Sequence, residues 1–483
     1  MNRVEVTIVQ QRILALWAAV GFAVVGSARA DVVDEYVAAQ LAAQNIPGLS
    51  LAVIRDGAVI KTAGYGFANL ETQSRASANT VYPLCSVTKQ FVAAGILLLE
   101  RDGKLSLDDP IEKHLDFTAA NWRGITLRHL LTMTSGIKDY INDPLTPGAP
   151  SLDESRDFPK SDTSADEILR RVASLPLNFP AGERFAYSNT NYITLAHVIT
   201  RVSGKPWHAF LGERIFQPLG MTHTGYDDPL AIVPNRAGRY DVIEDLRSQE
   251  LRNSDWVNPT FWWQGGAGIV SSVNDMAKWD SALRRGRVLT ETDVQKIRVP
   301  QALSDGSTNS YGFGWNNDPY AGHGRMWHNG SVPGSSIHFA RFDDGKLSVV
   351  VMANTPANLD AIAIDIAGML EPALVHPILL VSSTSAHANA GSPIEFNVRT
   401  TNWGKPIDGV IAIEIRSAPY DRDDVTAKLS SGKCRFLFRK SIRNSFTWTP
   451  PHSGEYRIYI GVFSEDWTRL YTWRNSAGVI LAK

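Results

Sequence analysis

The pattern of apolar positions divides the chain into two regions. In the first, residues 31–372, Val32 to Gln44 has helical spacing, and Leu49 to Ile54 alternates into Asp56-Gly57, which is a hairpin turn signal. A helix followed by a hairpin predicts an α+β domain with an antiparallel sheet. Beyond Glu371-Pro372 the helical spacing disappears, and Gly, Pro and Ser turns separate strand-like runs. This change predicts an all-β domain over 378–483.

The same pattern predicts the other elements. In the first region, helices are expected at 125–133, 165–175, 192–203, 273–283 and 360–370, and strands near Trp327, at 337–342 and at 347–352. Long loops are expected at 140–163 and at 226–263, where Trp262-Trp263 either lines a cleft or packs in the core. In the second region, strands at 394–398, 410–415 and 456–460 fit a β-sandwich of immunoglobulin-like size.

One predicted helix begins with two chemically active side chains. The run Phe91 to Leu99 is apolar on every side, so this helix is expected to be buried and to end near Asp102-Gly103. Ser86 and Lys89 are three residues apart, which places them on one face of a helix, one turn from each other. A hydroxyl at the positive end of a helix, beside a lysine that can draw off its proton, has the parts of an activated nucleophile.

The Ser-x-x-Lys spacing is not specific by itself. It also occurs at Ser135, with Lys138, and at Ser430, with Lys433. Cys85 is a second candidate nucleophile next to Ser86, but a small buried residue before the helix is the interpretation that its surroundings favour. The other cysteine is Cys434, so far away in the sequence that no disulfide is expected.

Composition narrows the classes of function. The formal net charge is −1, with 44% apolar and 20% charged residues, which is ordinary for a globular protein of two or three domains. The chain has no basic excess that would hold a phosphate backbone, so nucleic acid is not an expected partner. Two cysteines cannot form a cysteine-based zinc site, and no His-Glu-x-x-His motif occurs. We expect no metal and no cofactor.

Residues 1–30 have the pattern of a secretory signal peptide. Arg3 and Arg12 precede an apolar stretch at 13–26, and Ala28-Arg29-Ala30 is a cleavage signal. A retained membrane anchor is the alternative, but the stretch is shorter than the roughly 20 residues of a membrane span. We therefore expect export to the periplasm or the medium, with no other membrane-spanning segment.

Five ordered blocks between Ile46 and Thr355 resemble the serine hydrolase superfamily of class C β-lactamases, low-molecular-weight penicillin-binding proteins, D-aminopeptidases and related esterases. The blocks are Cys85 to Lys89, Ile125 to Ile137, Phe179 to Asn189, Pro218 to Met221 and Gly265 to Ser272. The resemblance implies an antiparallel sheet flanked by helices, an all-helical lobe, and a cleft between them. Five blocks in the family's order are far more specific than any single motif.

The resemblance also implies the roles of individual residues. Ser86 is the nucleophile that forms an acyl-enzyme, and Lys89 holds its proton network. Tyr187 is the partner base, with a pKa expected to be lowered by Lys89; whether Lys89 or Tyr187 takes the proton stays open. Asn189 orients the substrate. Tyr140-Ile141-Asn142 also matches Tyr-x-Asn, but Tyr187 follows the Pro-Ala-Gly loop of the family pattern.

The third family motif differs in this chain. β-Lactamases carry Lys-Thr-Gly on the strand that lines the cleft, and no Lys-Thr-Gly is present. His-x-Gly occurs at His223, His328 and His452, and only His328 follows the Gly-Gly-x-Gly block on an expected strand. Gly330 would let a substrate backbone approach closely, and the N–H groups of Ser86 and Ser331 would form an oxyanion hole.

Replacing lysine by histidine favours particular substrates. A histidine of ordinary pKa is mostly neutral at pH 7, so it binds a carboxylate more weakly than a charged lysine does. The leading hypothesis is an exported serine hydrolase acting on a D-amino-acid amide or short peptide, such as a cell-wall fragment. A small-ester hydrolase or a weak β-lactamase with the same site is the second hypothesis.

A third hypothesis is a catalytically silent penicillin or peptide sensor, or a glycan-binding protein. The glycan-binding alternative rests on aromatic residues of the second region that could stack on sugars. These residues are Trp403, Trp467, Tyr471 and Trp473. The sequence does not indicate the oligomeric state.

Overall fold

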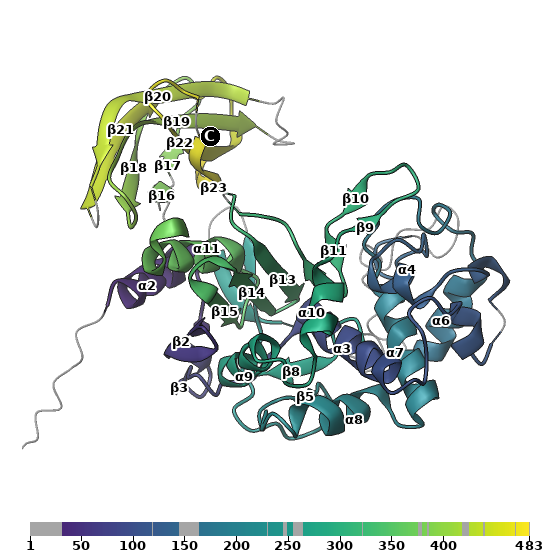
Figure 1. Ribbon diagram of the computed structural model, residues 1–483. Coiled ribbons are helices and arrows are strands. Elements are labelled where there is room, and N and C mark those ends of the chain that lie inside the picture. The colour runs from purple at the N-terminus through teal and green to yellow at the C-terminus, as the bar shows by residue number, and fades with distance from the viewer. Residues whose placement is uncertain are drawn as a thin grey trace, which may run out of the picture.

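An eight-stranded sheet forms the centre of the first region (Figure 1). The computed structural model describes residues 31–117, 119–143, 164–228, 230–244, 249–254, 264–320, 322–374, 379–383, 386–417, 425–437, 440–468 and 470–482. The strand order of the sheet is β11-β12-β13-β14-β15-β1-β2-β3, and each neighbouring pair is antiparallel. The strands are β1 Gly48–Arg55, β2 Ala58–Asn69, β3 Ser74–Arg75, β11 Tyr311–Gly312, β12 Trp315–Asn316, β13 Arg325–Val332, β14 Ser335–Phe342 and β15 Leu347–Ala353.

Both faces of this sheet are buried, which explains the nearly continuous apolar sequence of its central strands. In β1, Leu49, Leu51 and Val53 point to one core, whereas Ala52 and Ile54 point to the other. The first core lies under α2 (Val32–Gln44) and α11 (Leu359–Leu370), and the second lies against α3 (Thr88–Arg101) and α9 (Val273–Arg284).

A helical lobe lies beside the sheet on the α3 side (Figure 1). Buried α3 packs against α7 and α8, and α7 also packs against α4 and α6. The lobe contains α4 Leu127–Leu131, α6 Ala165–Ala173, α7 Asn189–Ser203 and α8 Trp207–Leu211. A three-stranded sheet, β4 Tyr82–Pro83, β8 Ile269–Ser271 and β5 Gly225–Tyr226, joins the lobe to the start of α3. This region also contains α10 Glu291–Arg298, the β9–β10 pair (Gln301–Ala302 and Thr308–Asn309) and the β6–β7 hairpin (Tyr240–Glu244 and Gln249–Asn253).

The expected helix at 125–133 is much shorter in the structure. Thr126 and His129 form a capping box at its start, but α4 ends at Leu131. Met133 adopts a left-handed backbone with φ of 57°, which no α-helix can continue. The apolar pattern of this segment reflects burial in the lobe core rather than helix length.

The second region consists of two sheets around a core of their own. The sheets have the orders β16-β18-β21 and β17-β23-β22-β19-β20. The strands are β16 Leu379–Ser383, β17 Ala386–Ala388, β18 Ile394–Asn402, β19 Ile407–Ser417, β20 Val425–Phe436, β21 Lys440–Trp448, β22 Gly454–Phe463 and β23 Leu470–Ala482. The elements of the second region that the structure describes are thus all β-strands, as the sequence predicts.

Trp403 links this second region to the first. It is 9% exposed and packs edge-on against Tyr36 of α2, with ring centroids 6.0 Å apart. Trp403 is therefore not available as a sugar-stacking surface. Trp467 is 49% exposed, whereas the side chains of Tyr471 and Trp473 lie outside the described residues.

Several other predictions concern membranes, cysteines or segments outside the described residues. No helix in the described ranges has the length and apolar character needed to cross a membrane. Cys85 and Cys434 are both free thiols, and Cys85 is fully buried. The described residues do not include the predicted signal peptide at 1–30, most of the expected loop at 140–163, or Trp262-Trp263.

Candidate active site

The start of α3 is a tight turn that presents Ser86. Residues Cys85–Val87 form a single 3₁₀ turn directly before α3, and Cys85 has φ of 48°, a left-handed conformation that a non-glycine residue seldom adopts. Strand β8 fixes this turn on both sides, because Ile269 O accepts from Leu84 N at 2.8 Å and Ile269 N donates to Thr88 Oγ1 at 3.2 Å. Ser86 is half-buried, so its hydroxyl is the accessible group of an otherwise buried turn.

Lys89 lies one turn into the helix and is completely buried. Its Nζ donates to Ser86 Oγ at 3.1 Å, to Asn189 Oδ1 at 2.9 Å and to Gly266 O at 2.8 Å. Burial disfavours the charged amine and lowers the pKa of Lys89 to about 7. An amine of this pKa is about half neutral at pH 7, and a neutral amine can accept a proton from the hydroxyl beside it.

Tyr187 completes the group around Ser86. Its hydroxyl is hydrogen-bonded to the Ser86 side chain, and Lys89 Nζ lies 5.0 Å from its ring centroid. Burial raises the pKa of Tyr187 well above its ordinary value. The prediction that Lys89 lowers this pKa was therefore wrong, because desolvation of the phenolate outweighs any nearby positive charge.

Asn189 is the first residue of α7 and points into the same site. Its Oδ1 accepts from Lys89, and its Nδ2 donates to the carboxylate of Asp139 at 3.1 and 3.3 Å. The residue is 7% exposed. Both ends of its amide are thus engaged within the protein, whereas the sequence suggested that Asn189 orients the substrate.

His328 lies on β13, as expected, but its imidazole does not face an open cleft. It is 2% exposed; Nδ1 lies 2.6 Å from Asn329 O, and Nε2 lies 3.1 Å from the hydroxyl of Tyr311. The first contact places the proton on Nδ1, so Nε2 accepts from Tyr311. Burial, together with the nearby Lys89, lowers the pKa of His328 to about 3. The imidazole is neutral at pH 7.

Gly330 allows β13 to touch the nucleophile turn. A Cβ atom at this position would lie 2.6 Å from Cys85 Cβ and 2.8 Å from Ser86 N, distances that side chains do not adopt. The backbone that lies close to Gly330 is thus that of the Ser86 turn, whereas the sequence suggested that of a substrate. This close approach brings the backbone of Gly330 beside the N–H of Ser86.

Sequence reasoning did not identify three groups in this site: Tyr311, Asp139 and the carbonyl of Gly266. Tyr311 begins the segment Tyr-Gly-Phe-Gly-Trp, whose Gly314 has φ of 84° and would place a Cβ 2.7 Å from the Lys89 backbone. The two glycines between aromatic residues in this segment are the sequence feature that could have pointed to Tyr311. Asp139 carries no comparable local signal.

The competing motifs do not assemble into sites. Ser135 Oγ donates to Asn191 Oδ1, whereas Lys138 Nζ donates to Asn178 Oδ1. Ser430 and Lys433 lie on the exposed strand β20, where Lys433 Nζ forms an ion pair with Glu465 at 2.7 Å.

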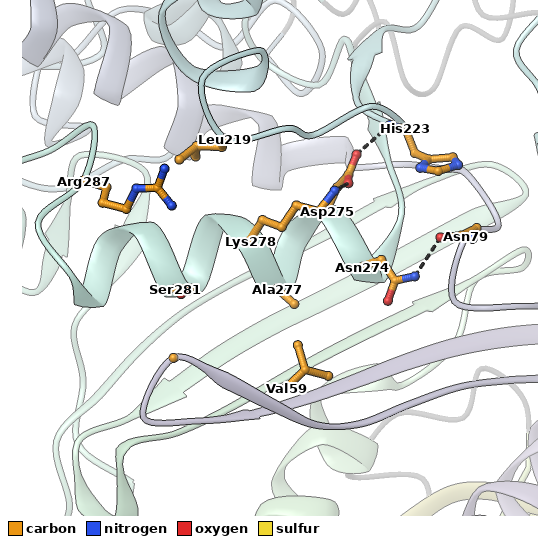
Figure 2. A pocket seen from close by; sticks show the side chains of 11 residues that line it. Val59, Asn79, Leu219, His223, Asn274, Asp275, Ala277, Lys278, Ser281 and Arg287 are labelled. Atoms are coloured by element: carbon orange, nitrogen blue, oxygen red, sulfur yellow. Dashed lines mark hydrogen bonds and ion pairs between the residues drawn. The ribbon is translucent and has the colours of Figure 1, made fainter.

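The His-x-Gly match at His223 belongs to a separate pocket. This pocket has a volume of about 400 Å³ and lies along α9. Figure 2 shows His223 beside Asp275 of this helix, whose Oδ2 accepts from His223 N at 2.6 Å. Ser86 is not among the residues that line the pocket.

Fold and site together define a class. An antiparallel sheet with covering helices, a helical lobe, and a Ser-x-x-Lys turn between them form a β-lactamase/transpeptidase-like fold. The chain belongs to the Beta-lactamase family, whose model matches residues 33–371.

Individual relatives agree with this assignment. Penicillin-binding protein 4* of Bacillus subtilis is 28% identical over 62% of this chain and 66% of its own length. A D-aminopeptidase of Gluconobacter oxydans is 28% identical over 64% of this chain and 56% of its own length. The chain thus spans less than two thirds of either relative.

A solved structure shares the fold of nearly the whole chain. The octameric penicillin-binding protein homologue from Pyrococcus abyssi superposes with a TM-score of 0.60 over 92% of this chain and 99% of that chain, at 20% identity. At this identity the likeness concerns the fold alone.

Proposed function

We propose that this protein is a serine hydrolase in which Ser86 forms an acyl-enzyme and Lys89 is the general base. The observation that carries the proposal is the contact between Lys89 Nζ and Ser86 Oγ at 3.1 Å, made by a fully buried amine with a pKa of about 7. A lysine of ordinary pKa would be protonated at pH 7 and could not accept a proton.

The reaction follows from the positions of these groups. Neutral Lys89 takes the Ser86 proton while Ser86 Oγ attacks the substrate carbonyl, and the N–H groups of Ser86 and Ser331 stabilise the oxyanion. Tyr187, whose raised pKa keeps it protonated, relays a proton from Lys89 to the leaving amine or alcohol. A water molecule then attacks the acyl-enzyme, releasing the acid and restoring the Ser86 hydroxyl.

His328 favours substrates that lack a carboxylate next to the scissile bond. A lysine at this position would offer a fixed positive charge, but His328 is neutral and its Nε2 is occupied by Tyr311. We therefore propose D-amino-acid amides and short peptides as substrates, including cell-wall fragments, and the D-aminopeptidase relative supports this class. Small esters are the second candidate, since they need the same machinery and no carboxylate contact.

The organisation of the chain fits an exported enzyme. We propose a hydrolase domain at 31–372 and an immunoglobulin-like sandwich at 378–483, preceded by a cleaved signal peptide at 1–30. The strand orders β16-β18-β21 and β17-β23-β22-β19-β20 support an immunoglobulin-like arrangement, as does the parallel pairing of β17 with β23.

A matched pair of peptides tests the substrate proposal. D-Alanyl-D-alanine and its C-terminal methylamide share the bond between the two alanines. The first places a negatively charged carboxylate toward His328, whereas the second places a neutral amide there. We expect a higher kcat/KM for the methylamide than for the free acid. The Ser86→Ala variant should hydrolyse neither peptide. Faster hydrolysis of the free acid would contradict the assignment, and covalent labelling without turnover of amides or esters would indicate a silent sensor.

A further inference from the structure

We propose that Asp139 is a positioning residue for the Ser86–Lys89 pair: it fixes the orientation of the Asn189 amide and supplies the negative charge that faces Lys89. This inference rests on the proposed function, because it concerns the base that activates Ser86. Asp139 lies in the segment after α4 and is 3% exposed. It makes no contact with Ser86 that would give it a chemical role of its own.

The contacts of Asp139 converge on the start of α7. Its Oδ1 accepts from the backbone N–H of Asn189 at 3.2 Å and of Ile141 at 3.2 Å. Asn189 Nδ2 donates to both carboxylate oxygens, and Asn142 Nδ2 donates to Oδ2 at 2.5 Å. The carboxylate therefore caps a helix whose own N-cap residue, Ser188, makes no side-chain cap bond.

These contacts identify the protonation state that the site requires. Each of these partners of the carboxylate oxygens is an N–H donor, and an O–H on Asp139 would find no acceptor among them. Burial raises the pKa of Asp139, whereas the N–H donors and Lys89 oppose that rise. The network of donors fits the ionised carboxylate.

Asp139 decides which end of the Asn189 amide meets Lys89. Because Nδ2 donates to Asp139, Oδ1 is turned toward Lys89 Nζ and accepts from it at 2.9 Å. With the amide reversed, an NH₂ group would face the amine, and two donors would oppose each other. Asp139 thus holds Lys89 aimed at Ser86 through one intervening side chain.

The charge of Asp139 also acts on Lys89 directly. The titratable groups that face Lys89 are Cys85 on the nucleophile turn, Tyr187 and Tyr192 at α7, His328 on β13, and Asp139. The thiol and both phenols stay neutral because burial raises their pKa values, and His328 is also neutral. Asp139 therefore provides the charge that stabilises protonated Lys89 against burial.

Asp139→Asn tests the inference through the pH dependence of Ser86 labelling by a fluorescent fluorophosphonate. Removing the negative charge disfavours protonated Lys89, so the neutral base persists to lower pH. We expect the acid limb of the labelling rate to move down by about one pH unit, and the maximal rate to fall roughly tenfold. A residue that only supports the fold would lower the rate at every pH without moving the limb.

Matched variants separate the possible outcomes. Asp143→Asn makes the same change on the same segment, where the carboxylate accepts from Asp139 N and Asn178, and should leave the limb in place. Asp139→Glu should return the acid limb of the labelling rate to its wild-type position. If circular dichroism shows that Asp139→Asn is unfolded, Asp139→Ser takes its place. An unmoved limb in a folded uncharged variant overturns the inference, whereas an unlabelled wild-type protein overturns the proposed function instead.

Discussion

Lys89 shows how burial changes the chemistry of a single residue. Its Nζ has three oxygen acceptors, yet desolvation outweighs them and brings the pKa to about 7. Tyr187 responds to the same burial in the opposite direction, since for a phenol the charged form is the deprotonated one. In the proposed mechanism the two groups therefore act as a base and an acid at neutral pH.

We expect a pH dependence that reports Lys89. The rate of fluorophosphonate labelling should be half-maximal near pH 7 and fall tenfold per pH unit below it, because protonated Lys89 cannot accept the Ser86 proton. Lys89→Arg should lower the maximal rate by about a thousandfold, since arginine stays charged. A wild-type rate that does not change between pH 5 and 8 would exclude Lys89 as the base.

Tyr311→Phe removes the hydroxyl that donates to His328 Nε2. We expect the free energy of unfolding to fall by about 1–3 kcal/mol, because a buried acceptor is left without a partner. Urea denaturation measures this loss. In the wild-type protein, nitrogen NMR of His328 should show a neutral ring protonated at Nδ1 down to pH 5; a charged ring at pH 6 would contradict the assignment.

The candidate residues differ in how far the sequence could reveal them. Ser86 and Lys89 follow from their spacing together with the family resemblance, and Tyr187 follows from the resemblance of the loop before it. Tyr311 and Asp139 act through partners 17 and 50 positions away, so only the folded chain brings them to the site. The reversed pKa shift of Tyr187 was missed for a related reason, since burial depends on the whole lobe.

At the scale of elements, the site is formed where β13 touches the turn before α3. The proposed oxyanion hole needs both elements, because Ser86 lies in the turn and Ser331 in β13, and Gly330 permits the contact between turn and strand. The sheet itself was predictable, because the Asp56-Gly57 turn fixes β1 against β2 locally. The length of α4 was not predictable, since the tertiary structure sets the left-handed backbone of Met133.

Gly330→Ala tests this contact. The added methyl group would force β13 away from the Ser86 turn, so we expect labelling to slow by roughly a hundredfold in a protein that still folds. Gly432→Ala on β20 is the matched control, because a Cβ there meets nothing within 4 Å. A labelling rate equal to that of the wild type in Gly330→Ala would show that the close contact is not needed for the reaction.

At the scale of the whole molecule, the two regions have separate cores joined in part by Trp403 on Tyr36. This contact lies in the core on the α2 face of the sheet, whereas Cys85 and Val87, on either side of Ser86, belong to the core on the opposite face. Through Trp403 the second region therefore contacts the first on the α2 face of the sheet. Its strands were predictable from alternation, but its contact with α2 was not, because nothing local marks Trp403 as an interface residue.

Trp403→Ala should separate stability from activity. We expect a loss of about 2–4 kcal/mol in the free energy of unfolding, because a largely buried indole is removed, with no change in labelling rate. Trp467→Ala is the control: its ring is about half exposed and packs on Phe463, so the change should stay below about 0.5 kcal/mol. Equal effects of the two substitutions would argue against the proposed contact.

Intact-protein and peptide mass spectrometry after reaction with a fluorophosphonate at pH 8 tests directly whether Ser86 is the nucleophile. We expect one adduct per chain, located on Ser86, absent from Ser86→Ala and strongly reduced in Lys89→Arg. An unmodified wild-type protein, or an adduct that persists in Ser86→Ala, would contradict this assignment.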